Sequence, residues 1–187
     1  MSLLEQQNFL ARLYTDENLR KRFLSAPEKI GKENNLDEKE IAELAAVLPE
    51  ELNFFADSLF WKRLREVEKM LPLTRKFFAE NFESYFREFS QSYQPNSVKK
   101  HLEDAIEFVN FINKREKEDV WIKDLARFEQ AKLEFNACGK NFVFRVFDFD
   151  VKGIHRTDAE AQSFKLKKKK TLAVWLRIGK KVKHFVI

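Results

Sequence analysis

Cysteine and histidine, which often serve as nucleophiles, bases and metal ligands, are few in this sequence and are scattered. The chain has one cysteine, Cys138, and three histidines, His101, His155 and His184. Catalysis needs a nucleophile, base, metal or cofactor held in one pocket, and no local motif groups these residues. A reactive thiol at Cys138 with partners from distant segments is one interpretation, and an incidental cysteine is the simpler one. We therefore expect no catalytic residues and a protein that is not an enzyme.

Metal and cofactor motifs are also absent from the sequence. The histidines lack the spacing of zinc ligands, and the four glycines form no phosphate-binding loop. Asp148 and Asp150 are two residues apart and would share one face of a strand, where they could hold a metal weakly. Acids at the end of a strand more usually face solvent. We expect no metal and no cofactor.

A run of lysines is the strongest charge signal. Residues 140–187 contain 13 Lys or Arg and 4 Asp or Glu, whereas residues 1–139 contain 22 and 26. The candidate partner-binding residues in the basic segment are Lys165, Lys167, Lys168, Lys169 and Lys170. Such a run could contact phosphates or an acidic partner, with affinity that falls as salt rises. The alternative is a solvated edge strand that its lysines protect from unwanted pairing.

A second basic group lies within a long helical pattern. Its candidate partner-binding residues are Lys62, Arg63 and Arg65. They could form a docking or recognition surface, although Glu66 and Glu68 follow closely and a solvated helix face with local ion pairs is the alternative. The sequence has no helix-turn-helix signature that would place this helix in a DNA groove.

Two periodicities divide the chain near Gly139. Before it, apolar residues recur every three or four positions, which predicts a series of helices, the longest over residues 51–71 and ended by Pro72. Pro27 is placed to begin a helix. The expected helix N-caps are Thr15 or Asp16, Asp37, Ser97 and Asp119, with Glu40 completing a capping box.

After Gly139 the period changes to two. Strands are expected over Asn141–Phe149, Thr171–Ile178 and Lys181–Ile187, with a further edge strand over Ser163–Lys168. Gly179 and Lys180 have the form of a two-residue hairpin turn. Both faces of the first strand are apolar enough to be core, so the pattern leaves open which of them is buried.

These elements define an α+β protein with a mainly helical N-terminal body and a small antiparallel β-sheet. The expected parts are a helical segment at 1–50, a helical domain at 51–139 and a β domain at 140–187. A hydrophobic content of 44% excludes a disordered chain. The start lacks the pattern of a signal peptide, no apolar run is long enough to span a membrane, and a single cysteine fits a reducing compartment. We expect a cytoplasmic, bacterial-type protein.

Part of the helical body resembles a known family. The motifs that carry the likeness are Trp61-Lys62-Arg63-Leu64-Arg65, Leu71-Pro72, Phe82 and Phe86, Pro95-x-Ser97, Phe108-x-x-Phe111 and Trp121-x-x-Asp124-Leu125-Ala126-Arg127-Phe128-Glu129. They resemble the family that carries the label DNA-binding domain, whose relatives include the partner proteins of methanobactin-type peptide-modifying iron oxygenases. Motifs near both ends of the chain are similar to an uncharacterised bacterial group with the same layout.

The resemblance implies an accessory subunit that holds a leader peptide or docks on an iron-containing enzyme. Together with the basic C-terminal segment, it leads us to expect a non-enzymatic binding protein that recognises a peptide or protein partner. That partner could be a precursor peptide together with its modifying enzyme. The alternative function is nucleic-acid binding through the basic residues of the β domain and the long helix.

Overall fold

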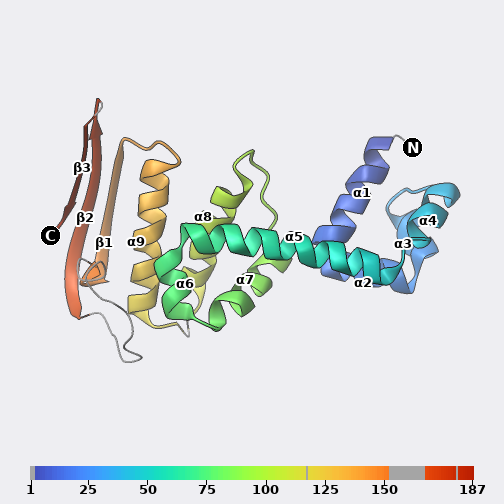
Figure 1. Ribbon diagram of the computed structural model, residues 1–187, viewed down its shortest axis with the longest axis horizontal. Coiled ribbons are helices and arrows are strands. Elements are labelled where there is room, and N and C mark those ends of the chain that lie inside the picture. Colours follow the sequence, from blue (N-terminus) through green and yellow to red (C-terminus); the bar gives the residue numbers. More distant parts are fainter. Residues whose placement is uncertain (1–2, 117, 152–166, 180) are drawn as a thin grey trace. The chain divides into compact units, whose positions relative to one another are not determined.

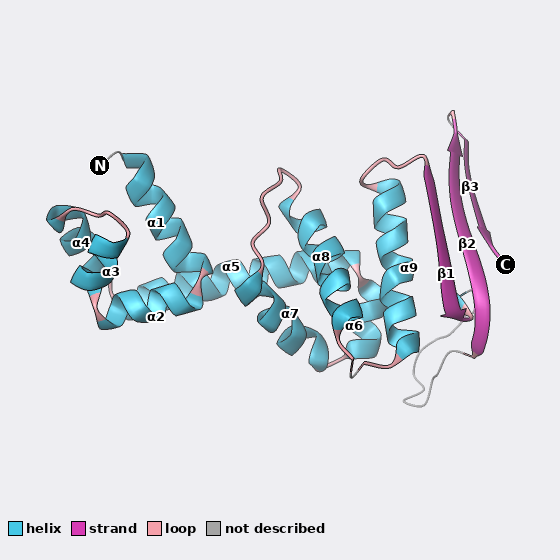
Figure 2. Cartoon of the chain, turned by 180° about the vertical axis from the view of Figure 1, so that it is seen from behind, coloured by secondary structure: helices cyan, strands magenta, loops and turns pink. Residues whose placement is uncertain are grey.

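The computed structural model describes residues 3–116, 118–151, 167–179 and 181–187. Helices are followed by a small antiparallel sheet, which confirms the predicted α+β class (Figures 1 and 2). The helices are α1 (Leu3–Thr15), α2 (Glu17–Ser25), α3 (Pro27–Glu33), α4 (Glu38–Ala45), α5 (Pro49–Met70), α6 (Pro72–Phe78), α7 (Asn81–Ser92), α8 (Lys100–Lys114) and α9 (Val120–Asn136). The strands are β1 (Phe142–Phe149), β2 (Lys168–Ile178) and β3 (Lys181–Val186).

The chain separates into two compact units. The first comprises Met1–Arg65 and Ser90–Gln94, and the second comprises Glu66–Phe89 and Pro95–Ile187. The boundaries therefore fall within α5 and within α7, where each helix contributes residues to both units.

The first unit packs α1 to α4 around a small apolar core. Phe9 and Phe23 meet edge to face in it, with ring centroids 5.4 Å apart. Asp16 accepts a hydrogen bond from the backbone N–H of Leu19, and Asp37 with Glu40 forms a reciprocal capping box, so the predicted caps at Asp16 and Asp37 are confirmed, whereas Thr15 is the last residue of α1. Such caps fix where short helices begin, since the first turn of a helix has unpaired donors.

The second unit builds its core from aromatic side chains of several helices. Phe82, Phe86, Phe89 and Phe108 are buried, and Phe108 contacts the other three with centroid separations of 5.2, 5.2 and 5.5 Å. Edge-to-face and tilted pairs of this kind add to the stabilisation from burial. Four of the chain's 20 phenylalanines are buried in this cluster.

The sheet of the second unit has the strand order β1-β2-β3, and both pairs are antiparallel. The three predicted strands are confirmed, although β2 begins at Lys168, three residues before its predicted start. The strand expected at Ser163–Lys168 lies outside the described residues apart from Lys167 and Lys168. At the predicted hairpin turn, Gly179 has φ +60°, a left-handed conformation that glycine adopts readily.

One predicted helix cap is wrong. Ser97 does not begin a helix, because α8 starts at Lys100. The backbone N–H of Ser97 instead donates to the Glu103 carboxylate, 2.7 Å away, so the turn is held by a side chain from inside the helix that follows. Asp119 is at the N-cap of α9, but its carboxylate accepts from the Trp121 indole and makes no capping bond to the backbone.

Candidate functional site

The residues that could have carried catalysis do not form a constellation in the described part of the chain. Cys138 is exposed after the end of α9, and His184 stacks on Trp175 with centroids 4.7 Å apart. His101 lies on α8, and His155 lies outside the described residues. Within the described residues, no group of three or more His, Cys, Asp or Glu side chains could hold a metal ion. None of the helices described is both long and apolar enough to cross a membrane.

Helix α9 carries a buried carboxylate that caps another helix. Glu129 accepts hydrogen bonds from the backbone N–H groups of Leu73 and Thr74 at 2.9 and 2.8 Å and from the Thr74 hydroxyl at 2.7 Å. These donors belong to the first turn of α6, which has no cap from its own N-cap residue, Leu71. Burial raises the pKa of Glu129, and the three donors oppose that change. The residue fixes α6 against α9.

A second buried carboxylate of α9 holds the first strand. Asp124 Oδ2 accepts from the backbone N–H groups of Asp148 and Phe149 at 2.6 and 3.2 Å, and its other oxygen pairs with Arg127 at 3.0 Å. The Arg127 guanidinium also donates to the carbonyl of Val146. Burial raises the pKa of Asp124, again opposed by its donors. Because Asp148 takes part through its backbone, Asp124 anchors the sheet to the helix.

The inner face of the sheet packs against α9 (Figure 1). Val143, Phe147, Ala173 and Trp175 are each at most 3% exposed and form one core with Phe128 of α9. The side chains alternate along each strand, as a pleated sheet requires. The residues between them must therefore point to the opposite side.

That opposite side, which we call the outer face, is also apolar but is exposed. Phe144 is 45% exposed, and Phe185 is 48% exposed. The register places Phe144 beside Val174, and Val174 beside Phe185, in one row across the three strands. The further apolar residues of this face are Phe142, Val146, Leu172, Leu176, Ile178 and Ile187. Figures 1 and 2 show α9 on one side of the sheet and no described element of this unit on the other.

An apolar face of this extent is unusual for a surface in contact with water. Single exposed apolar residues are normal, whereas contiguous patches on soluble proteins commonly mark interaction sites. Three neighbouring strands supply the outer face. In the middle of β2, the outward-facing residues are Leu172, Val174 and Leu176, and all three are aliphatic. The arrangement can bury the side chains of a partner but has no groups for acid, base or nucleophilic chemistry.

Lysines lie at both ends of the outer face. Lys169 and Lys170 follow Lys168 at the start of β2, where the register is irregular and places them opposite Asp148, between the pairs Phe147–Thr171 and Phe149–Lys168. Lys181 is opposite Ile178, and Lys183 is opposite Leu176, at the hairpin end. All four lysines are exposed, and none belongs to an ion pair found among the described residues.

The predicted site residues of the basic segment are thus only partly placed. Lys167 and Lys168 are exposed at the start of β2, beside Lys169 and Lys170, while Lys165 lies outside the described residues. The second predicted group, Lys62, Arg63 and Arg65, is on α5 in the first unit. The two groups belong to different units.

The bases of α5 differ in their surroundings. Arg63 donates to the carbonyl of Tyr93 at 3.2 Å and to the side chain of Gln94 at 3.3 Å, which gives it a role in holding the end of α7. Lys62 and Arg65 are exposed on the same helix. Arg63 is therefore a structural residue, and the predicted group of three is not a uniform charged surface.

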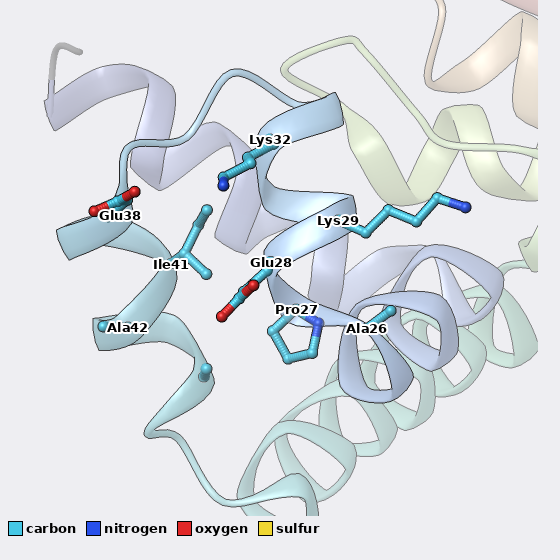
Figure 3. Close-up of a pocket in the computed structure, with 9 residues that line it drawn as sticks. Ala26, Pro27, Glu28, Lys29, Lys32, Glu38, Ile41 and Ala42 are labelled. Atoms are coloured by element: carbon cyan, nitrogen blue, oxygen red, sulfur yellow. The ribbon is translucent and has the colours of Figure 1, made fainter.

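The first unit also has an open groove between α3 and α4, of about 780 Å³ (Figure 3). Ile41, Ala42 and Pro27 give it an apolar floor, and charges of both signs, including Glu28 and Lys32, line its sides. Gly31 lets the two helices approach, because a Cβ at this position would lie 2.4 Å from Cγ1 of Ile41. The mixed charges favour no particular class of ligand.

No family model and no curated protein sequence matches the chain. The resemblance of the helical body to accessory proteins of iron oxygenases therefore stays a prediction. The outer face is the feature that sequence reasoning missed. Its signal was present in Asn141–Phe149, where both sets of alternating residues are apolar, but only the position of α9 distinguishes the buried set from the exposed one.

Proposed function

We propose that this chain is a non-enzymatic binding protein that holds a peptide or protein partner on the outer face of its C-terminal sheet. The observation that carries the proposal is the exposed apolar row through Phe144, Val174 and Phe185, which continues in both directions on β1 and β2 and towards Ile187 on β3. Covering such a face removes apolar surface from water, and each large side chain that becomes fully buried contributes about 1.5 to 3 kcal/mol. A protein partner supplies the complementary apolar surface.

The chemistry of the partner follows from the residues around the face. The lysines at both ends favour acidic residues in the partner over basic ones. A precursor peptide and the iron-dependent enzyme that modifies it fit this role, and they are the partners that the resemblance of residues 55–137 implies. The single cysteine favours a reducing, cytoplasmic setting.

Nucleic-acid binding is the second candidate function. It is favoured by one specific observation, the exposed rings of Phe142, Phe144 and Phe185 on a sheet that also carries lysines. Single-stranded nucleic acids bind such surfaces by stacking their bases on aromatic rings while cations contact the phosphates. The aliphatic residues outnumber the rings on the outer face and cannot stack with bases in this way, so we place the protein partner first.

Selection from a displayed library of random peptides tests the proposal. The bait is the full chain, and the comparison bait is the double variant Phe144→Ser/Leu172→Ser. Phe54→Ser is the matched control, since Phe54 is 78% exposed on α5 and lies in the other unit. Far-UV circular dichroism and the thermal midpoint establish that each variant is folded.

Peptides enriched on the wild type should bind the Phe54→Ser control equally and should bind the double variant at least about tenfold more weakly, as the loss of apolar contacts requires. Equal binding to the double variant, or no enrichment at all, would overturn the proposed function. Single-stranded oligonucleotides titrated at low and moderate salt test the second candidate. Binding that weakens steeply with salt and is lost in the double variant would favour nucleic acid instead.

A further inference from the structure

We infer that the segment bound by the outer face is a single amphipathic helix with acidic residues near both of its ends. This inference rests on the proposed function and adds the secondary structure and the charge pattern of the ligand. Two features of the sheet carry it, namely the placement of lysines at the two ends of the apolar face and the dimensions of that face.

The lysines are separated along the strand direction. Lys170 precedes Leu172 on β2, while Lys183 is opposite Leu176, so the two positions are six residues apart along β2. At about 3.3 Å per residue the separation along the strand is about 20 Å. The outward positions between them are Leu172 and Val174, with Phe144 and Phe185 beside Val174 on the neighbouring strands. The face is therefore apolar in the middle and has lysines at each end, and at the hairpin end these lysines lie on β3 beside Leu176 and Ile178 of β2.

One acidic residue lies at the end of the face where β2 begins. Asp148 is exposed on β1 near Lys169 and Lys170, and it offsets part of their charge. With Lys167 and Lys168 also exposed there, that end has an excess of positive charge. At the hairpin end, Lys181 and Lys183 face outward with no carboxylate opposite them in the register.

The width of the sheet favours a helix over a strand. Three strands separated by about 4.8 Å have outer axes about 10 Å apart, which matches the diameter of one α-helix. An extended segment would cover about one strand and leave the other rows in water. A helix reaches across about 20 Å in about 13 residues, so its acids would be about three to four turns apart.

A second copy of this chain is a poorer occupant. Packing two outer faces together would bring the lysines of one copy towards those of the other, because the same cations border both faces. Like charges at a closed interface oppose association. An acidic helix places a charge of opposite sign at each end and avoids this conflict.

The test uses a displayed library of 18-residue helices with a fixed apolar stripe. Two positions near each end are randomised among Glu, Gln and Lys, and the bait is the full chain. We expect Glu to be enriched at both ends. The selected peptide is then synthesised, and its binding is measured by fluorescence anisotropy against the wild type, Lys169→Gln/Lys170→Gln and Lys181→Gln/Lys183→Gln. Lys76→Gln/Lys114→Gln is the matched control, since both of its lysines are exposed on helices of the same unit.

Each of the two end variants should weaken binding about 3- to 20-fold, as expected for the loss of two surface ion pairs, and the control should not. A peptide of the same composition with a central proline, which cannot form a continuous helix, should bind at least tenfold more weakly. If Glu, Gln and Lys are selected equally at the randomised positions, or if the proline peptide binds as tightly as the selected peptide, this inference is overturned. The proposed function would still stand if those peptides lost affinity for Phe144→Ser/Leu172→Ser.

Discussion

The Glu129 carboxylate offers the sharpest test of how the second unit is held together. Its Oε2 atom accepts from the Thr74 N–H and hydroxyl, and its Oε1 atom accepts from the Leu73 N–H. In Glu129→Gln, the amide oxygen can keep the two Thr74 bonds, but the amide nitrogen then points a donor at the Leu73 N–H. Loss of one hydrogen bond to a charged group costs about 1.5 to 3 kcal/mol, and we expect the free energy of unfolding at pH 7 to fall by about that amount.

The effect should depend on pH in a defined direction. Burial raises the pKa of Glu129 above its ordinary value of 4.5, so the folded chain binds this proton more tightly than the unfolded chain does. The resulting stabilisation is complete below the unfolded pKa and is lost as the pH rises through the folded pKa. Glutamine does not titrate. The difference in unfolding free energy between wild type and Glu129→Gln should therefore shrink as the pH rises above about 4.5 and through the folded pKa.

Urea unfolding followed by tryptophan fluorescence measures this difference, because Trp121 and Trp175 both lie in the second unit. Trp61→Phe as a common background removes the signal of the first unit. Glu80→Gln is the matched control, since Glu80 is exposed and carries the same change of charge. If Glu129→Gln and Glu80→Gln both unfold within about 0.5 kcal/mol of the wild type, the range typical of surface substitutions, Glu129 does not stabilise α6.

Three further predictions concern local packing and are measured by thermal or urea unfolding of the full chain. Phe147→Ala should cost about 3 to 5 kcal/mol because Phe147 is 1% exposed, whereas Phe144→Ala on the outer face should cost less than about 1 kcal/mol; equal costs would contradict the assignment of the two faces. Gly31→Ala should destabilise the first unit by about 1 to 3 kcal/mol, because the added methyl group would overlap with Ile41. Adding Ile41→Ala should make the cost of Gly31→Ala smaller. If Gly31→Ala leaves the stability unchanged, or if its cost is the same in the Ile41→Ala background, the helices adjust freely. Asp37→Ala should cost about 0.5 to 2 kcal/mol through loss of its capping box, and no loss would mean that α4 does not depend on its cap.

What the sequence predicts well in this chain is local. The caps at Asp16 and Asp37 act within three residues of themselves. Proline at the start of α3 and α6 also acts locally, because its fixed backbone angle favours the first turn of a helix. The change of period after Gly139 separates helices from strands because side-chain direction repeats differently in the two. These features require no knowledge of how the chain folds back on itself.

The remaining features depend on contacts between distant segments. Glu129 caps α6 from 55 residues away, and no spacing rule connects the two. Ser97 has the residue type of a cap, but Glu103 binds its backbone and the helix begins later. The candidate site also depends on contacts between distant segments. The lysine run was evident in the sequence, whereas the exposed apolar face between the lysines depends on which side of β1 receives α9.

The Asp124–Arg127 pair has a consequence for how the sheet behaves at high protein concentration. An unpaired strand edge is a template on which other chains can add strands and aggregate. Along the edge of β1 that does not pair with β2, the N–H of Asp148 and the carbonyl of Val146 are already hydrogen-bonded to side chains of α9. A strand added there would have to displace a buried carboxylate and its guanidinium partner. The helix that supports the sheet therefore also protects this part of its edge against growth into larger assemblies.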